Sequence, residues 1–154
     1  MKKLFLISIG LVFYSCNQGV VFDEYKDFSK QAWNADDVLR FEYFIKDTKS
    51  NYTTLLKVRH TVDYEYQNLF LFVSNETQRD TVELFLADKK GEWFGKGIGE
   101  IREMEIVLSG KKQYKDKKKN TVVIEQAMRY GDKEKIKKLK NIDALGITVF
   151  VDDE

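Results

Sequence analysis

Residues with reactive side chains are few, and the most informative is the single cysteine, Cys16. It follows Lys2 and Lys3, an apolar run over residues 4–14 and the small residue Ser15. A basic start, a short apolar stretch and a small residue before the cut are typical of a secretory signal peptide. Because only a thiol can carry the diacylglyceryl thioether of a bacterial lipoprotein, the position of Cys16 predicts lipidation there.

This interpretation divides the chain into a lipoprotein signal peptide, residues 1–15, and a lipid-anchored domain, residues 16–154. The apolar run is shorter than the roughly 20 residues that a spanning helix needs. Position 17 is Asn rather than Asp, so the common cue for inner-membrane retention is missing and the outer membrane is expected. We expect the domain to face the periplasm rather than the cell surface. The alternative is an ordinary secretory signal followed by a buried thiol.

Catalytic chemistry finds little support in the remaining residues. His60 is the sole histidine, which excludes a two-histidine metal site, and no G-x-S-x-G motif occurs. Glycoside hydrolysis needs only two facing carboxylates, and the candidates for such a pair are Asp23, Glu24, Glu42, Glu65, Glu83, Glu100, Glu105 and Glu125. Charged residues at strand periodicity are usually solvated. We therefore expect no enzyme, no cofactor and no metal site, with an envelope hydrolase as the remaining catalytic alternative.

The glycines between Gly91 and Gly99 do not complete a phosphate-binding motif. A P-loop requires G-x-x-x-x-G-K-[ST], and a dinucleotide fingerprint requires a helix that starts at the glycines. Here Gly99 is followed by the polar residues 100, 102 and 103. Turn and bulge glycines are the better interpretation.

Length and charge limit the remaining function classes. The chain has 154 residues, which fits one domain. Its 26 basic and 25 acidic residues give no overall field that would gather nucleic acid, so no nucleic-acid partner is expected.

Strand periodicity dominates the mature chain and predicts an all-β fold. About eight short strands without helical repeats indicate a two-sheet antiparallel β-sandwich, jelly-roll-like in kind. In the strand over residues 38–45, Leu39, Phe41, Tyr43 and Ile45 share one face. The predicted strands cover residues 20–25, 38–45, 54–60, 69–73, 81–86, 104–108, 121–124 and 146–151, with the fourth and fifth forming a hairpin. The only predicted helix covers residues 132–139.

Two surface features have competing interpretations. Tyr64, Tyr66, Trp93 and Phe94 fall in or near predicted turns, where aromatic side chains can stack on sugars or contact a partner protein. The alternative is that they cap the open ends of the sandwich. Residues 111–119 hold six lysines, which can contact anionic headgroups or an acidic partner, or form a solvated hairpin tip.

Several segments in order are similar to the GldH gliding-motility lipoprotein family. They are Val21-Phe22-Asp23-Glu24-Tyr25-Lys26, Leu56-Lys57-Val58-Arg59-His60, and residues 64–73, 80–83, 87–97, 124–129 and 139–147. The chain departs from the family pattern at His60 and Asn141, where Asn and Gly are common, and in its lysine-rich tip. Residues 80–82 also resemble an O-glycosylation sequon of exported proteins, with Thr81 as acceptor.

The resemblance implies a non-enzymatic outer-membrane lipoprotein that acts with the type IX secretion machinery, which exports and moves surface adhesins. Other envelope proteins of gliding and secretion would be its partners. Only Cys16 carries over as a functional residue, as the lipid attachment point to the membrane. The alternative function is a glycan-binding module on the same scaffold, with Tyr64, Tyr66 and Trp93 as its platform.

The lipidation prediction can be tested with Cys16→Ser. Without the thiol no thioether forms, so the variant should remain uncleaved or become a soluble product. Membrane fractionation and intact-mass measurement distinguish these products from the mature lipoprotein. A mature-size variant that still fractionates with membranes would contradict the anchor.

Overall fold

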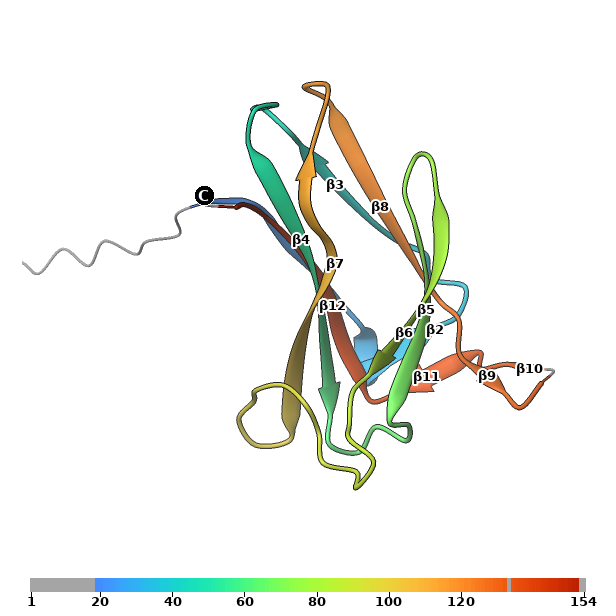
Figure 1. The fold of residues 1–154 in the computed structure, drawn as a ribbon. Coiled ribbons are helices and arrows are strands. Elements are labelled where there is room, and N and C mark those ends of the chain that lie inside the picture. The colour runs from blue at the N-terminus through green and yellow to red at the C-terminus, as the bar shows by residue number, and fades with distance from the viewer. Residues whose placement is uncertain (1–18, 133, 153–154) are drawn as a thin grey trace, which may run out of the picture.

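Two antiparallel sheets of four strands pack face to face and enclose the core (Figure 1). The computed structural model describes residues 19–132 and 134–152, so the predicted signal peptide and Cys16 lie outside the described residues. Sheet I contains, in spatial order, β1 (Val20–Asp27), β12 (Ile142–Val151), β4 (Asn51–Thr61) and β7 (Ile101–Gln113). Sheet II contains β3 (Leu39–Phe44), β8 (Lys119–Gln126), β5 (Asn68–Ser74) and β6 (Arg79–Phe85).

The predicted β-sandwich is confirmed, since each of the eight expected strands overlaps one strand of these sheets. The expected hairpin is also present as the pair β5 and β6, in which Leu69 lies opposite Leu84. The strands of sheet I are longer than expected because charged residues continue them beyond their apolar centres. In β7, for example, the ladder with β4 extends from Ile101 to Gln113.

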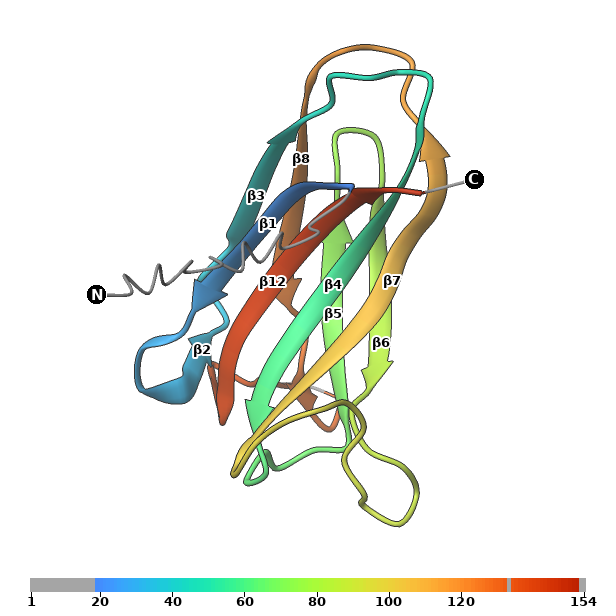
Figure 2. The ribbon, with the colours of Figure 1, turned by 90° about the vertical axis from the view of Figure 1, so that its left-hand side faces the viewer.

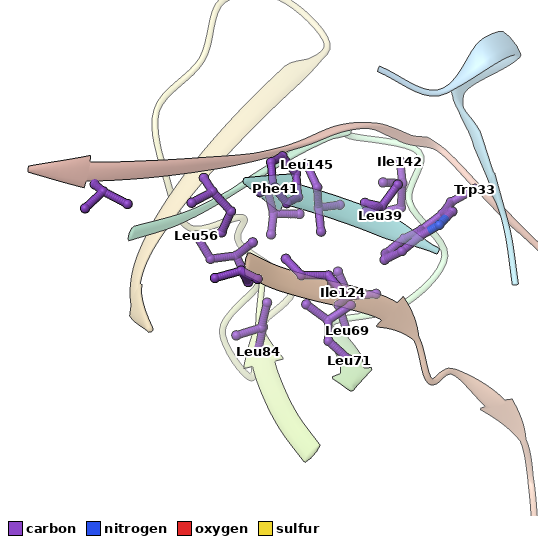
Figure 3. Packing of buried hydrophobic residues seen from close by; sticks show 14 of the residues in the cluster. Trp33, Leu39, Phe41, Leu56, Leu69, Leu71, Leu84, Ile124, Ile142 and Leu145 are labelled. Atoms are coloured by element: carbon purple, nitrogen blue, oxygen red, sulfur yellow. The ribbon is translucent and has the colours of Figure 1, made fainter. Parts of the chain in front are cut away.

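The core forms where alternating apolar residues of the two sheets meet (Figure 3). In β3, Leu39, Phe41 and Tyr43 are buried while the residues between them are exposed, as the sequence predicts for one apolar face. Leu56 and Leu145 contribute from sheet I. Burial of this apolar surface is the main favourable term in folding.

The helix predicted over residues 132–139 is wrong. The segment contains the short strands β10 (Glu134–Lys135) and β11 (Lys138–Lys140), which pair with β9 (Arg129–Tyr130) and β2 (Ala32–Asn34). Leu139 lies opposite Trp33 in the β2–β11 pair, and both side chains are buried. Two apolar residues three apart favour a helix only weakly, and pairing with β2 buries Leu139 more completely. A single 3-10 turn, η1 (Ser29–Gln31), precedes β2.

Because of the strand directions, the connections between strands lie at the two ends of the sandwich. The start of β1, the end of β12 and the turns at residues 45–50, 75–78 and 114–118 lie at one end, called here the N-terminal end. Residues 62–67 and 86–100 lie at the other, called here the opposite end (Figure 2). Contacts between β1 and β3 close one long side of the sandwich, where the Phe22 and Tyr43 rings are 5.7 Å apart.

The glycines of residues 91–99 form a turn at the opposite end, as the sequence predicts, and they also form a close backbone crossing with β7. Lys96 exchanges backbone hydrogen bonds with Glu103 at the edge of β7. A Cβ at Gly97 would lie 1.9 Å from the carbonyl oxygen of Ile101, and one at Gly95 would lie 2.2 Å from that of Glu103. Glycine is therefore required at both positions for steric reasons.

Gly97→Ala should lower the free energy of unfolding by about 1–3 kcal/mol, because the new methyl group meets backbone that cannot move aside. Gly110→Ala is the matched control, since its Cβ would meet only Val107 and Thr53 side-chain atoms at 3.7 and 3.9 Å. Urea denaturation should place the control within about 0.5 kcal/mol of the wild type. Equal losses in the two variants would contradict the close crossing.

Candidate functional site

The four aromatic residues predicted as contacts lie together at the opposite end, but they do not form an open platform. Tyr64 is 4% exposed, and its hydroxyl donates to the Asn68 carbonyl oxygen over 3.0 Å. Its ring is 5.6 Å from Tyr66 and 6.4 Å from Trp93, and both of these side chains are half-buried. Edge-to-face and tilted packing of these rings closes the end of the sandwich, which is the capping alternative.

Phe94 alone of the four is exposed, at 42%. The same loop carries Ile98, which is 94% exposed and which sequence reasoning missed. The signal that could have identified Ile98 as exposed is its position between two glycines in a turn, where no buried residue was expected. Phe94 and Ile98 are thus the large apolar side chains that this loop offers to a partner.

His60 lies beneath the aromatic cap, fully buried, with its ring 4.7 Å from Trp93 and 5.8 Å from Tyr64. Its Nδ1 lies 2.9 Å from the Thr61 carbonyl oxygen, so Nδ1 carries the proton and donates. Nε2 is buried with no hydrogen-bond partner among the described residues. Burial lowers the pKa of His60, and the charge of Arg102 lowers it further. The residue is therefore a neutral structural histidine.

The outer face of sheet I carries a polar network centred on Tyr25 of β1. Its hydroxyl donates to Glu103 Oε2 over 3.0 Å, and the same oxygen accepts from Arg59 Nε and Nη2 at 3.0 and 2.7 Å. The Arg59 guanidinium also lies 4.6 Å from the centre of the Tyr25 ring. Burial raises the pKa of Tyr25, and the Glu103 hydrogen bond raises it further, so the phenol stays protonated.

The network extends across the sheet because the Tyr25 ring packs closely against Gly146 of β12. A Cβ at Gly146 would lie 2.8 Å from the Tyr25 ring. Beside the ring, Asp23 Oδ1 accepts from Thr148 Oγ1 over 2.5 Å and from Lys57 Nζ over 3.2 Å. Sequence reasoning missed this network, although the alternation of β1 and β4 already places its members on one face.

The carboxylates considered for hydrolysis are spread over the molecule. Glu42 pairs with Lys119 at 2.7 Å and Glu125 with Arg79 at 3.2 Å, both on the outer face of sheet II. Glu83 accepts from Asn68 on the same face. Within residues 19–132 and 134–152, no group of three or more His, Cys, Asp or Glu side chains is arranged to hold a metal ion.

A cleft of about 630 Å³ opens at the N-terminal end, between the second half of β7 and the β5–β6 hairpin. Half-buried Val82 and Leu108 line it from the two edge strands. Deeper in, the hydroxyls of Tyr43 and Tyr114 are hydrogen-bonded at 2.9 Å. Of its acidic lining residues, Glu76 and Asp116 lie on exposed turns and Asp80 lies on β6.

Comparison with known proteins adds to this geometry. The model of the GldH lipoprotein family matches residues 20–149, from the start of β1 almost to the end of β12. A gliding motility lipoprotein GldH homolog from Christiangramia forsetii is 32% identical over 152 residues, covering 95% of this chain and 92% of the relative. The gliding motility lipoprotein GldH of Flavobacterium johnsoniae is 33% identical over 149 residues, covering 93% and 89%. The chain belongs to the GldH lipoprotein family.

Membership confirms the resemblance found in the sequence. The chain is a gliding-motility lipoprotein, and its location is a membrane to which a lipid anchors it. In the described part of the chain, no helix is long and apolar enough to cross a bilayer.

The buried neutral His60 predicts an acid-sensitive stability for this GldH-family sandwich. In the unfolded chain His60 takes up a proton near pH 6.5, whereas burial suppresses this in the folded state. The protonation of His60 therefore has no effect on the free energy of unfolding above about pH 6.5. Below that pH it lowers the free energy of unfolding, by up to about 1.4 kcal/mol per pH unit.

Urea unfolding at several pH values between about 5 and 7 measures this slope. His60→Asn keeps a donor for the Thr61 carbonyl but cannot titrate, so its stability should fall less over the same range. The comparison uses slopes, because the variant also leaves a cavity. Parallel pH profiles for the two proteins would contradict the assignment.

Proposed function

We propose that the protein is a non-enzymatic accessory or assembly factor of gliding motility and of the associated type IX secretion machinery. In this proposal Cys16 carries the lipid, the outer membrane holds it, and the domain faces the periplasm. It uses no cofactor and binds no nucleic acid, and its partners are other envelope proteins of gliding and secretion. Tethering to a surface raises the effective concentration of the domain for such partners.

The observation that carries this proposal is the exposed apolar pair on the loop of residues 86–100. Exposed Phe94 and Ile98 stand on a loop that Lys96 fastens to β7 and that Trp93 fastens to the aromatic cap. A braced loop loses little conformational entropy when a partner binds it, and large apolar side chains are the usual centres of protein interfaces.

The glycan-binding alternative depended on an exposed aromatic platform. Tyr64 is only 4% exposed, and the rings of half-buried Tyr66 and Trp93 pack against it. A sugar-stacking site would need the cap to open. Protein contact through the loop is the function that this geometry supports better.

The test is complementation of a gene deletion, which should itself abolish colony spreading and adhesin delivery. The double variant Phe94→Ser with Ile98→Ser should fail to restore spreading although it accumulates in membranes at the wild-type level. Phe44→Ser is the matched control, because Phe44 is 49% exposed compared with 42% for Phe94 but is the last residue of β3, at the N-terminal end of the sandwich.

Cross-linking in whole cells identifies the partners in the same strains. Motility or secretion proteins should be recovered with the wild type and with Phe44→Ser, and be depleted in the double variant. Normal spreading by the deletion strain, or full rescue by the double variant, would contradict the proposal. Loss of rescue by Phe44→Ser alone would place the contact surface elsewhere.

A further inference from the structure

The lysine-rich tip is a fixed part of the sandwich. Tyr114, in the middle of the lysine run, is only 6% exposed, and its hydroxyl bonds to that of Tyr43 inside the N-terminal end. The backbone of Lys118 accepts a hydrogen bond from the Ile45 amide over 3.1 Å, and Gln113 donates to the Lys49 carbonyl. The tip and the turn at residues 45–50 therefore form one surface.

Lysines collect on this surface. The turns and strand ends at the N-terminal end carry Lys46, Lys49, Lys111, Lys112, Lys115, Lys117, Lys118 and Lys119, all of them exposed. Lys118 pairs with Glu76 and Lys119 with Glu42, each at 2.7 Å. The other six form no ion pair among the described residues.

Acidic groups are few in the two segments that carry these lysines, residues 45–50 and 111–119. Asp47 and Asp116 lie in the two turns and Asp152 follows β12, where it accepts a hydrogen bond from Thr53. Glu42, Glu76 and Asp80 also lie at this end, and Asp153 and Glu154 come next in the sequence. The positive surplus therefore belongs to residues 45–50 and 111–119, where the eight lysines meet only Asp47 and Asp116. Residues 62–67 and 86–100 have the reverse balance, with Asp63, Glu65, Asp88, Glu92 and Glu100 against Lys89, Lys90 and Lys96. The connection between β8 and β12, which lies at the same end, also carries basic residues, including Arg129, Lys135, Lys137, Lys138 and Lys140.

The start of the domain lies in the same row as the lysine-bearing end of β7. Val151 donates its backbone N–H to Gly19 over 2.8 Å, Val151 lies opposite Tyr52, and Tyr52 lies opposite Lys112. Neighbouring strands are about 4.8 Å apart, so three steps place Lys112 roughly 14 Å from Gly19. Figure 2 shows β1 and β12 meeting near the turns of that end.

The tether is short. Three peptide units separate Cys16 from Gly19, and an extended chain covers at most about 3.6 Å per residue, or about 11 Å in all. A lipid on Cys16 therefore holds the N-terminal end within roughly that distance of the headgroups. The turns at residues 45–50 and 114–118 extend past the row that contains Gly19, which brings their lysines to the headgroup layer.

We infer that the lysine-bearing N-terminal end is a binding surface for anionic phospholipid headgroups of the same membrane that holds the lipid. The two attachments together set the sandwich end-on, with Phe94 and Ile98 on the side away from the bilayer. This inference rests on the proposed lipidation of Cys16. A basic surface is attracted to an anionic leaflet only within about a Debye length of 8–10 Å, a range that the short tether provides.

Lysine footprinting of the lipidated mature protein on vesicles tests the orientation. The protein is reconstituted on phosphatidylcholine vesicles, with or without about one-third phosphatidylglycerol, and acetylated with an uncharged N-hydroxysuccinimide ester. Peptide mass spectrometry reads each lysine. Anionic vesicles should slow acetylation of Lys112, Lys115 and Lys117 severalfold, leave Lys89 and Lys90 unchanged, and lose the effect at high salt.

The variant Lys112→Gln with Lys115→Gln and Lys117→Gln should lose protection of the remaining Lys46 and Lys49. Lys89→Gln with Lys90→Gln is the matched control and should keep it. Equal footprints on the two kinds of vesicle, or protection of Lys89 and Lys90 instead, would overturn the inference. Equal footprints on the two kinds of vesicle are the result expected if the true ligand of this surface is an acidic protein.

Flotation of the vesicles separates this inference from the function on which it rests. Failure of the mature wild type to float would refute the lipid anchor and the end-on orientation with it. Flotation without selective lysine protection would refute only the headgroup contact.

Discussion

The pairing of β1 with the end of β12 is the constraint on which the rest of the molecule depends. It fixes the start of the domain beside the last residues of β12, and the ladders to β4 and β7 continue that row to Lys112. Because β1 also packs against β3, the same strand closes one long side of the core. The position of the anchor and the burial of the core thus have a common origin.

Aromatic side chains close both ends of the sandwich, and the polar and charged groups lie on its surfaces. Tyr43, Tyr52 and Tyr114 fill the N-terminal end, and His60, Tyr64 and Trp93 fill the opposite end. Each cap fastens a loop, the lysine tip in one case and the loop with Phe94 and Ile98 in the other. This division suits a protein that works by contact at both ends of its long axis.

The sequence was sufficient for the sandwich because period-2 alternation, as in β3, identifies a strand and its buried face together. It failed at residues 132–139, where Leu139 is buried by pairing with Trp33, a contact more than a hundred residues distant that local spacing cannot reveal. The location of the aromatic residues was predicted from the sequence, but the burial of Tyr64 was not, because that burial depends on its packing with His60 and Trp93. The Tyr25 network was missed because it joins four strands, and only register brings Arg59 and Glu103 together.

A photoactivatable residue placed at Lys117 and, separately, at Lys89 tests the account most directly in living cells. Both side chains are exposed, and they mark the two ends of the sandwich. Irradiation should give phospholipid adducts from position 117 and adducts with envelope proteins from position 89, each identified by mass spectrometry. Protein adducts at position 117 together with lipid adducts at position 89 would show that the domain is held the other way round and would contradict the account.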